Sequence, residues 1–198
     1  MRDAENIREV EALGIDLMGF IFWPRSSRYV SERPAYLPQQ IKRVGVFVDA
    51  DIDDIKQRVQ DYRLDFIQLH GHESPDVVRQ LRPVCGDTIA TIKAFNIATA
   101  EDLLQAESYE GLADYFLFDT KGKSAGGNGE KFDWSVLEAY HGHTPFLLSG
   151  GIGPDDAERV TTFHHPRCVG IDLNSRFEVA PGLKDIHQLK EFIKKIRI

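Results

Sequence analysis

Residues 145–160 read PFLLSGGIGPDDAERV, a stretch with the pattern of one strand, one turn and one helix. The apolar run fits a buried strand, and Gly150 and Gly151 end it. Pro154 suits the first turn of a helix, and the acidic residues after it meet the positive end of that helix. The stretch therefore predicts one β–α unit.

The same unit recurs along the chain. The strands are near-continuous apolar runs, as in parallel strands that are covered on both faces. Expected strands cover residues 16–22, 43–48, 64–70, 88–95, 114–119, 145–151 and 168–175. Expected helices follow Asp3, precede residue 43, start near Ile52, Ser74, Thr99, Asp133 and Pro154, and end the chain at 185–196. Seven strands and eight helices in one domain fit either an open doubly wound sheet or a closed (β/α)8 barrel.

The composition excludes several classes of partner. The 198 residues are 42% hydrophobic and 28% charged, with a net charge of −7 and no basic stripe, so we expect no nucleic acid partner. No apolar run approaches the roughly 20 residues of a membrane span, and we expect a cytoplasmic protein. Cys85 and Cys168 form no CxxC motif, which argues against a disulfide framework or a thiolate metal site. Monomer and homodimer both stay open.

Polar residues follow the predicted strands, where both α/β architectures place their sites. Gly150 and Gly151 allow close approach of the backbone to a ligand, and the helix start after them offers N–H groups to a phosphate. Asn174 and Ser175 follow the next strand, so these four residues predict a phosphate site. The full set of strand ends is Arg25, Arg28, Asp49, His70, Asn96, Asp119, Ser149 and Asp172.

Asp119 ends the apolar run YFLF, and apolar surroundings disfavour a charged carboxylate, which suits it to work as a general acid. The Gly-rich stretch after it is expected to cover the site. His70 is expected to line the site as a neutral donor, since Gly71 separates it from His72 and argues against a metal pair. Arg28 has the shape to hold a carboxylate at two points.

Six segments, spread over the whole chain in order, carry a resemblance to phosphoribosylanthranilate isomerase, a (β/α)8 barrel of tryptophan biosynthesis. The resemblance favours the barrel over the open sheet. It implies an Amadori rearrangement of N-(5-phosphoribosyl)anthranilate without a metal or organic cofactor. The segments are MRDAENIREVEALGIDLMGFIFWPRSSRYV, KRVGVFVDA, DFIQLHGHES, LFDTKGKSAGGNGEKFDW, LLSGGIGPDDAERV and GIDLNSRFEVAPGLKD.

The resemblance also implies a role for each matched residue. Asp119 is the general acid, Arg28 holds the anthranilate carboxylate, Asp172 contacts the sugar hydroxyls and His70 lines the site. Gly150, Gly151, Asn174 and Ser175 hold the phosphate. The small-molecule phosphoribosyl substrate is the only partner it implies.

The chain departs from the family pattern at two places. Asn174 and Arg176 stand where the family usually has a second Ser and a Gly, although Asn still donates a hydrogen bond. The family also has a strand ending in Lys-x-Cys-Gly just before the segment that aligns with Met1, and that Cys is its general base. We therefore expect a barrel lacking its first strand over residues 1–198, Met1 as an internal start, two open edges and weak or no activity.

Two other functions fit the same residues. A phosphate-binding barrel without catalysis would be indifferent to replacement of Asp119 by Asn. A metal-dependent sugar-phosphate epimerase would need a His/Asp metal cluster, for which the strand ends supply one well-placed His.

Overall fold

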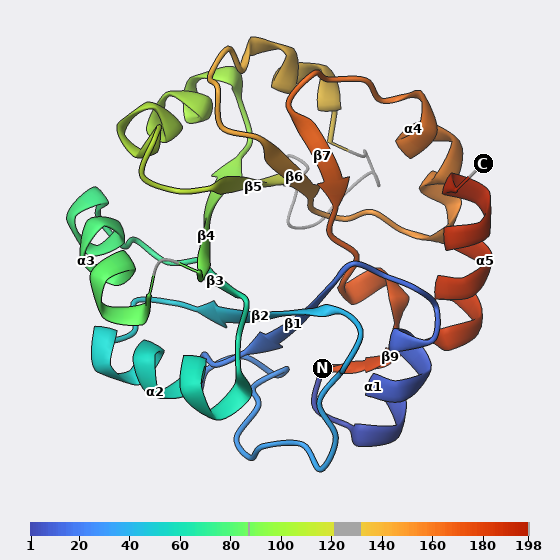
Figure 1. Cartoon of the computed structure of the whole chain (residues 1–198). Coiled ribbons are helices and arrows are strands. Elements are labelled where there is room, and N and C mark those ends of the chain that lie inside the picture. Colours follow the sequence, from blue (N-terminus) through green and yellow to red (C-terminus); the bar gives the residue numbers. More distant parts are fainter. Residues whose placement is uncertain (87, 121–131, 198) are drawn as a thin grey trace.

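The computed structural model describes residues 1–86, 88–120 and 132–197. Its main sheet has seven strands, each parallel to the next and in the order of the sequence. The sheet curls into most of a barrel, with β1 and β7 as its edges (Figure 1). The strands are β1 (Leu17–Ile21), β2 (Lys42–Phe47), β3 (Phe66–Leu69), β4 (Ala90–Ile97), β5 (Tyr115–Thr120), β6 (Phe146–Ser149) and β7 (Cys168–Ile171). All seven predicted parallel strands are confirmed.

The two faces of the curled sheet have separate cores, because successive side chains of a strand point to opposite faces. The concave face buries a small cluster that includes Val44, Ile92 and Leu117. The convex face packs Phe116 and Phe118, among many others, against the helices. Strand residues spaced by two from the small cluster therefore point into the barrel interior, and at the carboxyl ends these residues are polar.

Helices cover the convex face, and several begin where the sequence predicts. The Asp3 carboxylate accepts a hydrogen bond from the Asn6 backbone N–H at 2.8 Å, and Asp133 accepts one from Ser135 at 3.0 Å. No helix in the described part of the chain has the length and apolar content to cross a membrane. The α-helices are α1 (Ala4–Glu11), α2 (Ile52–Tyr62), α3 (Pro75–Cys85), α4 (Ala157–Thr162) and α5 (Ile186–Ile196). The 3₁₀ helices are η1 (Ala100–Tyr109), η2 (Trp134–Ala139), η3 (Pro154–Asp156) and η4 (Ser175–Phe177).

The short helix predicted before residue 43 is wrong, because residues 31–41 contain no helix. Pro34 and Pro38 lack backbone N–H groups and disfavour helical geometry in the residues before them. The Glu11 carboxylate instead accepts hydrogen bonds from the backbone N–H groups of Gln39 and Gln40, each at 2.6 Å. These contacts fix the loop against α1. The other seven of the eight predicted helices are observed.

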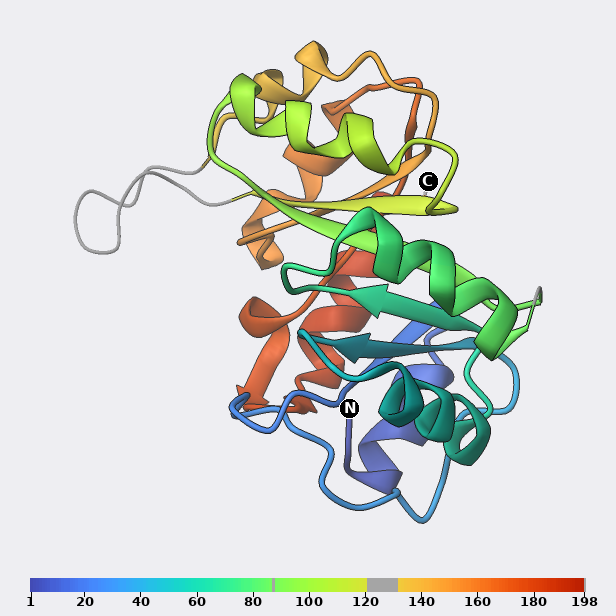
Figure 2. The same cartoon turned by 90° about the vertical axis from the view of Figure 1, so that its left-hand side faces the viewer.

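An antiparallel hairpin that the sequence analysis does not predict follows η4. It pairs β8 (Glu178–Ala180) with β9 (Leu183–Lys184), and its turn contains Gly182 at φ +81°. The hairpin lies at the same end of the barrel as the carboxyl ends of β2 and β3, beside the loop that follows β1 (Figure 2). It therefore adds side chains to the end where the site is expected.

The free edge of β1 is covered at two points. The Gly19 carbonyl accepts a hydrogen bond from the Met1 nitrogen at 2.8 Å, and the Ile21 carbonyl accepts one from Val30 at 2.9 Å. The expected open edge is therefore in part occupied by the chain's own backbone, which blunts its ability to pair with another strand.

Candidate active site

An imidazole and a carboxylate meet inside the barrel at the ends of β3 and β5. His70 Nε2 lies 3.5 Å from Asp119 Oδ2, and both side chains are about a quarter exposed. Gln68 Nε2 lies 3.0 Å from His70 Nδ1. Donation from Gln68 to Nδ1 leaves the proton of the neutral ring on Nε2, where it faces Asp119. The structure thus brings together the predicted acid and the predicted site-lining donor.

Asp172 lies on the next part of the same ring of strand ends. Its Oδ2 accepts a hydrogen bond from Ser149 Oγ at 2.9 Å. Ser149 pairs in register with Asp119, and Asn96 pairs with Asp119 from the other side. Asp172, Ser149, Asp119 and Asn96 therefore follow one another along the carboxyl ends of adjacent strands, as the sequence predicts.

The residues predicted to bind phosphate lie on two turns. Gly150 has φ +103°, and a Cβ there would lie 2.0 Å from the Thr120 carbonyl oxygen, so only glycine fits. Gly151, at φ +67°, has open space beside it. The turn at 174–176 lies against this region, since a Cβ at Gly153 would be 3.6 Å from Arg176 Cβ. The predicted phosphate residues thus lie on two neighbouring turns.

One backbone donor at this helix start is already used. The buried Asp156 carboxylate accepts a hydrogen bond from the Gly153 N–H at 2.8 Å. The Gly153 N–H is therefore not free for a ligand, and a phosphate here would rely on the 150–151 turn and on Asn174 and Ser175.

Arg28 is part of a charged cluster with the hairpin. Its Nη2 donates to Glu178 Oε2 at 2.6 Å, and Lys184 Nζ donates to Glu178 Oε1 at 3.1 Å and to Asn174 Oδ1 at 2.8 Å. Burial alone would raise the pKa of Glu178, but the hydrogen bonds and positive charges of Arg28 and Lys184 outweigh it and lower that pKa. Burial lowers the pKa of Lys184. Glu178 is therefore a buried anion between two cations.

The sequence analysis does not predict three residues of this region. Gln68 could have been found from its spacing of two from His70, which places both side chains on the interior face of one strand. Glu178 and Lys184 sit in a hairpin whose strands are too short to give a hydrophobic pattern, so nothing local points to them.

Neither cysteine is at this end of the barrel. Cys168 pairs with Phe146 at the start of β6, whereas Asp119 pairs with Ser149 at its end. Cys85 is the last residue of α3, which leads back to the amino end of β4. Both thiols have a pKa raised by burial. Neither is placed to take a proton from a ligand beside Asp119.

Two further predictions concern the Gly-rich stretch expected to cover the site and the metal cluster of an epimerase. The Gly-rich stretch at 121–131 lies outside the described residues. Among the residues that the structure describes, no three His, Cys, Asp or Glu side chains gather in a way that could hold a metal ion. The cluster that a metal-dependent epimerase needs is thus not found in that part of the chain.

The curled parallel sheet defines a (β/α)-barrel, and a carboxylate–imidazole pair lies inside it at the carboxyl ends of the strands. Comparison with known proteins narrows this class. The model of the N-(5'phosphoribosyl)anthranilate (PRA) isomerase family matches residues 1–195. The chain belongs to this family.

Individual relatives agree. The N-(5'-phosphoribosyl)anthranilate isomerase of Parabacteroides distasonis is 52% identical over 99% of this chain and 90% of its own. The crystal structure of the Thermotoga maritima enzyme has a TM-score of 0.83 and 30% identity, covering 100% of this chain and 95% of its own. A phosphoribosyl anthranilate isomerase in complex with reduced 1-(o-carboxyphenylamino)-1-deoxyribulose 5-phosphate has a TM-score of 0.79 and 28% identity, covering 100% and 98%.

Proposed function

We propose that this chain converts N-(5'-phosphoribosyl)anthranilate to 1-(2-carboxyphenylamino)-1-deoxyribulose 5-phosphate, an aldose–ketose isomerisation of tryptophan biosynthesis. The observation that carries the proposal is Asp119 at the interior end of β5, facing His70 Nε2 at 3.5 Å, in a chain of the PRA isomerase family. The solved relative that holds a reduced form of this product supports the ligand class.

The reaction begins with a proton delivered by Asp119. The protonated carboxyl group donates to the furanose ring oxygen, the bond from that oxygen to C1 breaks, and the nitrogen lone pair forms an iminium ion. Removal of the C2 proton then gives an enolamine, which relaxes to the ketone. A carboxyl group at the interior end of a strand can reach the ring oxygen of a substrate held in the barrel mouth, as a general acid requires.

The remaining residues bind the substrate. Arg28 faces the anthranilate carboxylate, Asp172 the sugar hydroxyls, and the turns at 150–151 and 174–175 the phosphate. The hydrogen bond from Ser149 leaves Asp172 with a free oxygen for a hydroxyl donor. No step in this scheme calls for a metal or an organic cofactor.

The experiment replaces Asp119 by Asn in a chain extended by the family's first strand, so that a general base is present, and follows the conversion of substrate. We expect the rate to fall by about 10²–10⁴-fold, the usual contribution of a general acid, while the affinity for the reduced product changes little. Asp114→Asn is the matched control, because Asp114 precedes the other end of β5 and accepts a hydrogen bond from the Thr91 backbone at 2.8 Å. An unchanged rate in Asp119→Asn would contradict the role and favour a binding barrel without catalysis.

The position of the general base leads to a second comparison. Neither Cys85 nor Cys168 lies at the catalytic end, so neither thiol can serve as the general base. Low activity of residues 1–198 therefore stays a prediction. The rate is measured for this chain and for one extended at its amino end by the family's first strand, which ends in Lys-x-Cys-Gly. Equal rates would show that residues 1–198 contain their own base.

A further inference from the structure

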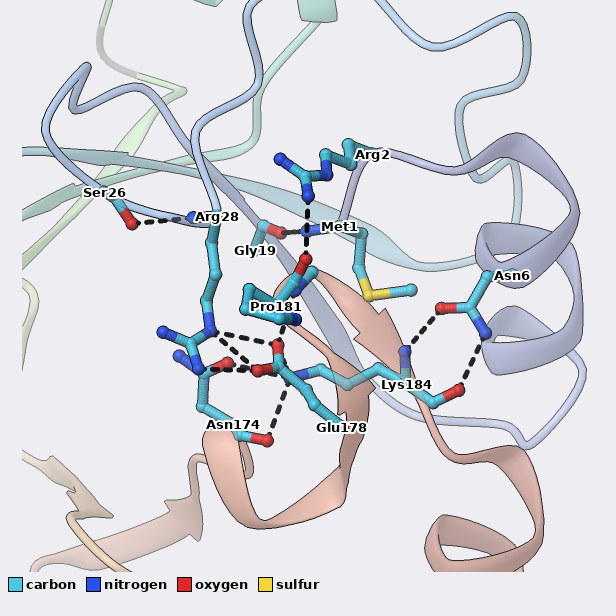
Figure 3. A network of polar contacts seen from close by, with 11 residues as sticks. Met1, Arg2, Asn6, Gly19, Ser26, Arg28, Asn174, Glu178, Pro181 and Lys184 are labelled. Carbon is cyan, nitrogen blue, oxygen red and sulfur yellow. Dashed lines mark hydrogen bonds and ion pairs between the residues drawn. The ribbon is translucent and has the colours of Figure 1, made fainter.

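Four residues at the mouth of the barrel, which we name the hairpin cluster, form one network: Arg28, Asn174, Glu178 and Lys184. They come from the loop after β1, the turn after β7, and both strands of the hairpin (Figure 3). Arg28 and Glu178 are 150 residues apart in sequence. The network therefore joins the predicted carboxylate site to the predicted phosphate site.

Glu178 is fixed independently of Arg28. Its side chain is 4% exposed, and its Oε1 accepts hydrogen bonds from Lys184 Nζ and from the Gly182 backbone N–H, both at 3.1 Å. Arg28 is 24% exposed and extends from a loop. A long, flexible cation is thus held by a short, anchored anion, so Glu178 sets the position and Arg28 follows it.

The hydrogen bonds select one edge of the guanidinium group. Nε donates to Glu178 Oε2 at 2.8 Å, and Nη2 donates to the same oxygen at 2.6 Å. This is the side edge of the planar group. Nη1 has no hydrogen bond to any residue that the structure describes, so the end edge formed by Nη1 and the second N–H of Nη2 is available to a ligand. A carboxylate fits this edge by two parallel hydrogen bonds.

The charge of the hairpin cluster also suits an anion. Arg28 and Lys184 contribute two positive charges and Glu178 one negative charge, so the cluster keeps a net positive charge after its internal pairing. Without Lys184, the Arg28–Glu178 pair would be neutral and would attract a second carboxylate weakly. The third charge is therefore what lets Arg28 be held by one carboxylate and still bind another.

Lys184 orients a second ligand-facing group. Its Nζ donates to the side-chain Oδ1 of Asn174 at 2.8 Å and to the backbone carbonyl of Asn174 at 3.1 Å. Because the Asn174 amide oxygen accepts from Lys184, the amide nitrogen is left to donate a hydrogen bond to a phosphate at the 174–175 turn. The Asn that departs from the family's Ser is thus fixed in a donating orientation.

We propose that Glu178 is a positioning residue that holds Arg28 by its side edge, so that the end edge receives the carboxylate of the substrate. Lys184 keeps the cluster cationic and ties it to Asn174. This inference rests on the proposed function in one respect, the assignment of the anthranilate carboxylate to Arg28.

The test compares the affinities of two ligands by calorimetry. One is reduced 1-(o-carboxyphenylamino)-1-deoxyribulose 5-phosphate, and the other is the same molecule without its carboxyl group. Their ratio of dissociation constants measures the carboxylate preference. We expect Glu178→Gln to lower this preference about tenfold or more, since each hydrogen bond to a charged group has an effect of that order. If Glu178 acted only through its charge, Glu178→Gln would raise the carboxylate preference, because the substitution removes a negative charge.

Control variants separate the failure of this inference from the failure of the proposed function. Arg28→Met should remove the carboxylate preference, and an intact preference would overturn the role of Arg28 itself. If Arg28→Met loses the preference and Glu178→Gln keeps or increases it, the positioning role alone is wrong. Glu110→Gln is the matched control, because Glu110 also accepts several hydrogen bonds, from Tyr140 and Thr144, away from the cluster.

A third variant keeps the test decisive if Glu178→Gln fails to fold. Glu178→Asp keeps the charge but shortens the side chain by one methylene group, so it cannot reach Arg28 and Lys184 with the same geometry. We expect a loss of carboxylate preference here too. A folded Glu178→Asp protein with the wild-type preference would contradict the positioning role.

Discussion

Two ion pairs with a buried carboxylate lie near the carboxyl ends of the strands, and they differ in whether the cation is also buried. Lys93 and Glu73, whose side chains are 3% and 2% exposed, meet at 3.2 Å. Arg28 and Glu178, at 24% and 4%, meet at 2.6 Å. The first pair is closed on all sides, whereas the second has one cation at the surface of the site.

Lys93 and Glu73, the closed pair, also form hydrogen bonds with backbone groups. Lys93 Nζ donates to the carbonyls of Gly71 at 2.9 Å and Ala94 at 3.1 Å. Glu73 accepts from the backbone N–H groups of Asp49 at 2.9 Å and Gly71 at 3.0 Å. The pair thus ties the loop beside His70 to the loop after β2. With all its donors used, it stabilises the fold, and only a pair with a free edge can also bind a ligand.

The largest expected effect is on the closed pair. Lys93→Met leaves the Glu73 carboxylate buried without its cation, and breaking a buried pair in this way typically costs about 3–5 kcal/mol of unfolding free energy. Urea unfolding measures this change, and the carboxylate preference of the folded fraction should stay at its wild-type value. Lys42→Met is the matched control, since Lys42 and Asp65 form an exposed pair. A loss below about 1 kcal/mol in Lys93→Met would remove the distinction between the two pairs.

A smaller effect is expected in the pH dependence of the Arg28–Glu178 pair. The pKa of Glu178 is lowered from its ordinary value of 4.5, so between these two values the unfolded chain binds more protons than the folded one. The stability that Glu178 contributes is therefore present above about pH 4.5 and is lost as the pH falls through its folded pKa. The difference in unfolding free energy between wild type and Glu178→Gln should shrink in this acid range. A difference that stays constant down to pH 3 would contradict it.

The sequence predicts what repeats and misses what is unique. Apolar runs recur seven times, so the strands and their polar ends, including His70, Asp119 and Asp172, are predicted correctly. Glu178 and Lys184 belong to a hairpin that occurs once, and their partner Arg28 is about 150 residues away, so no local pattern connects them.

Two further differences have the same origin. Lys93 interrupts an apolar strand, and its meaning depends on Glu73, which is brought to it by the curl of the sheet. The short helix expected before β2 is absent, since pairing with β1 already makes Lys42 the first residue of β2 and Glu11, in α1, holds the Gln39 and Gln40 N–H groups in a loop. Contacts between distant segments decide both outcomes, and periodicity within one segment does not contain them.

The most direct measurement is a crystal structure of this chain with reduced 1-(o-carboxyphenylamino)-1-deoxyribulose 5-phosphate. We predict the ligand carboxylate on Nη1 and Nη2 of Arg28, with Glu178 still bound to Nε, and the phosphate on the turns at 150–151 and 174–175. The Lys93–Glu73 pair should be unchanged. A carboxylate bound away from Arg28, or a Glu178 displaced from it, would contradict the account.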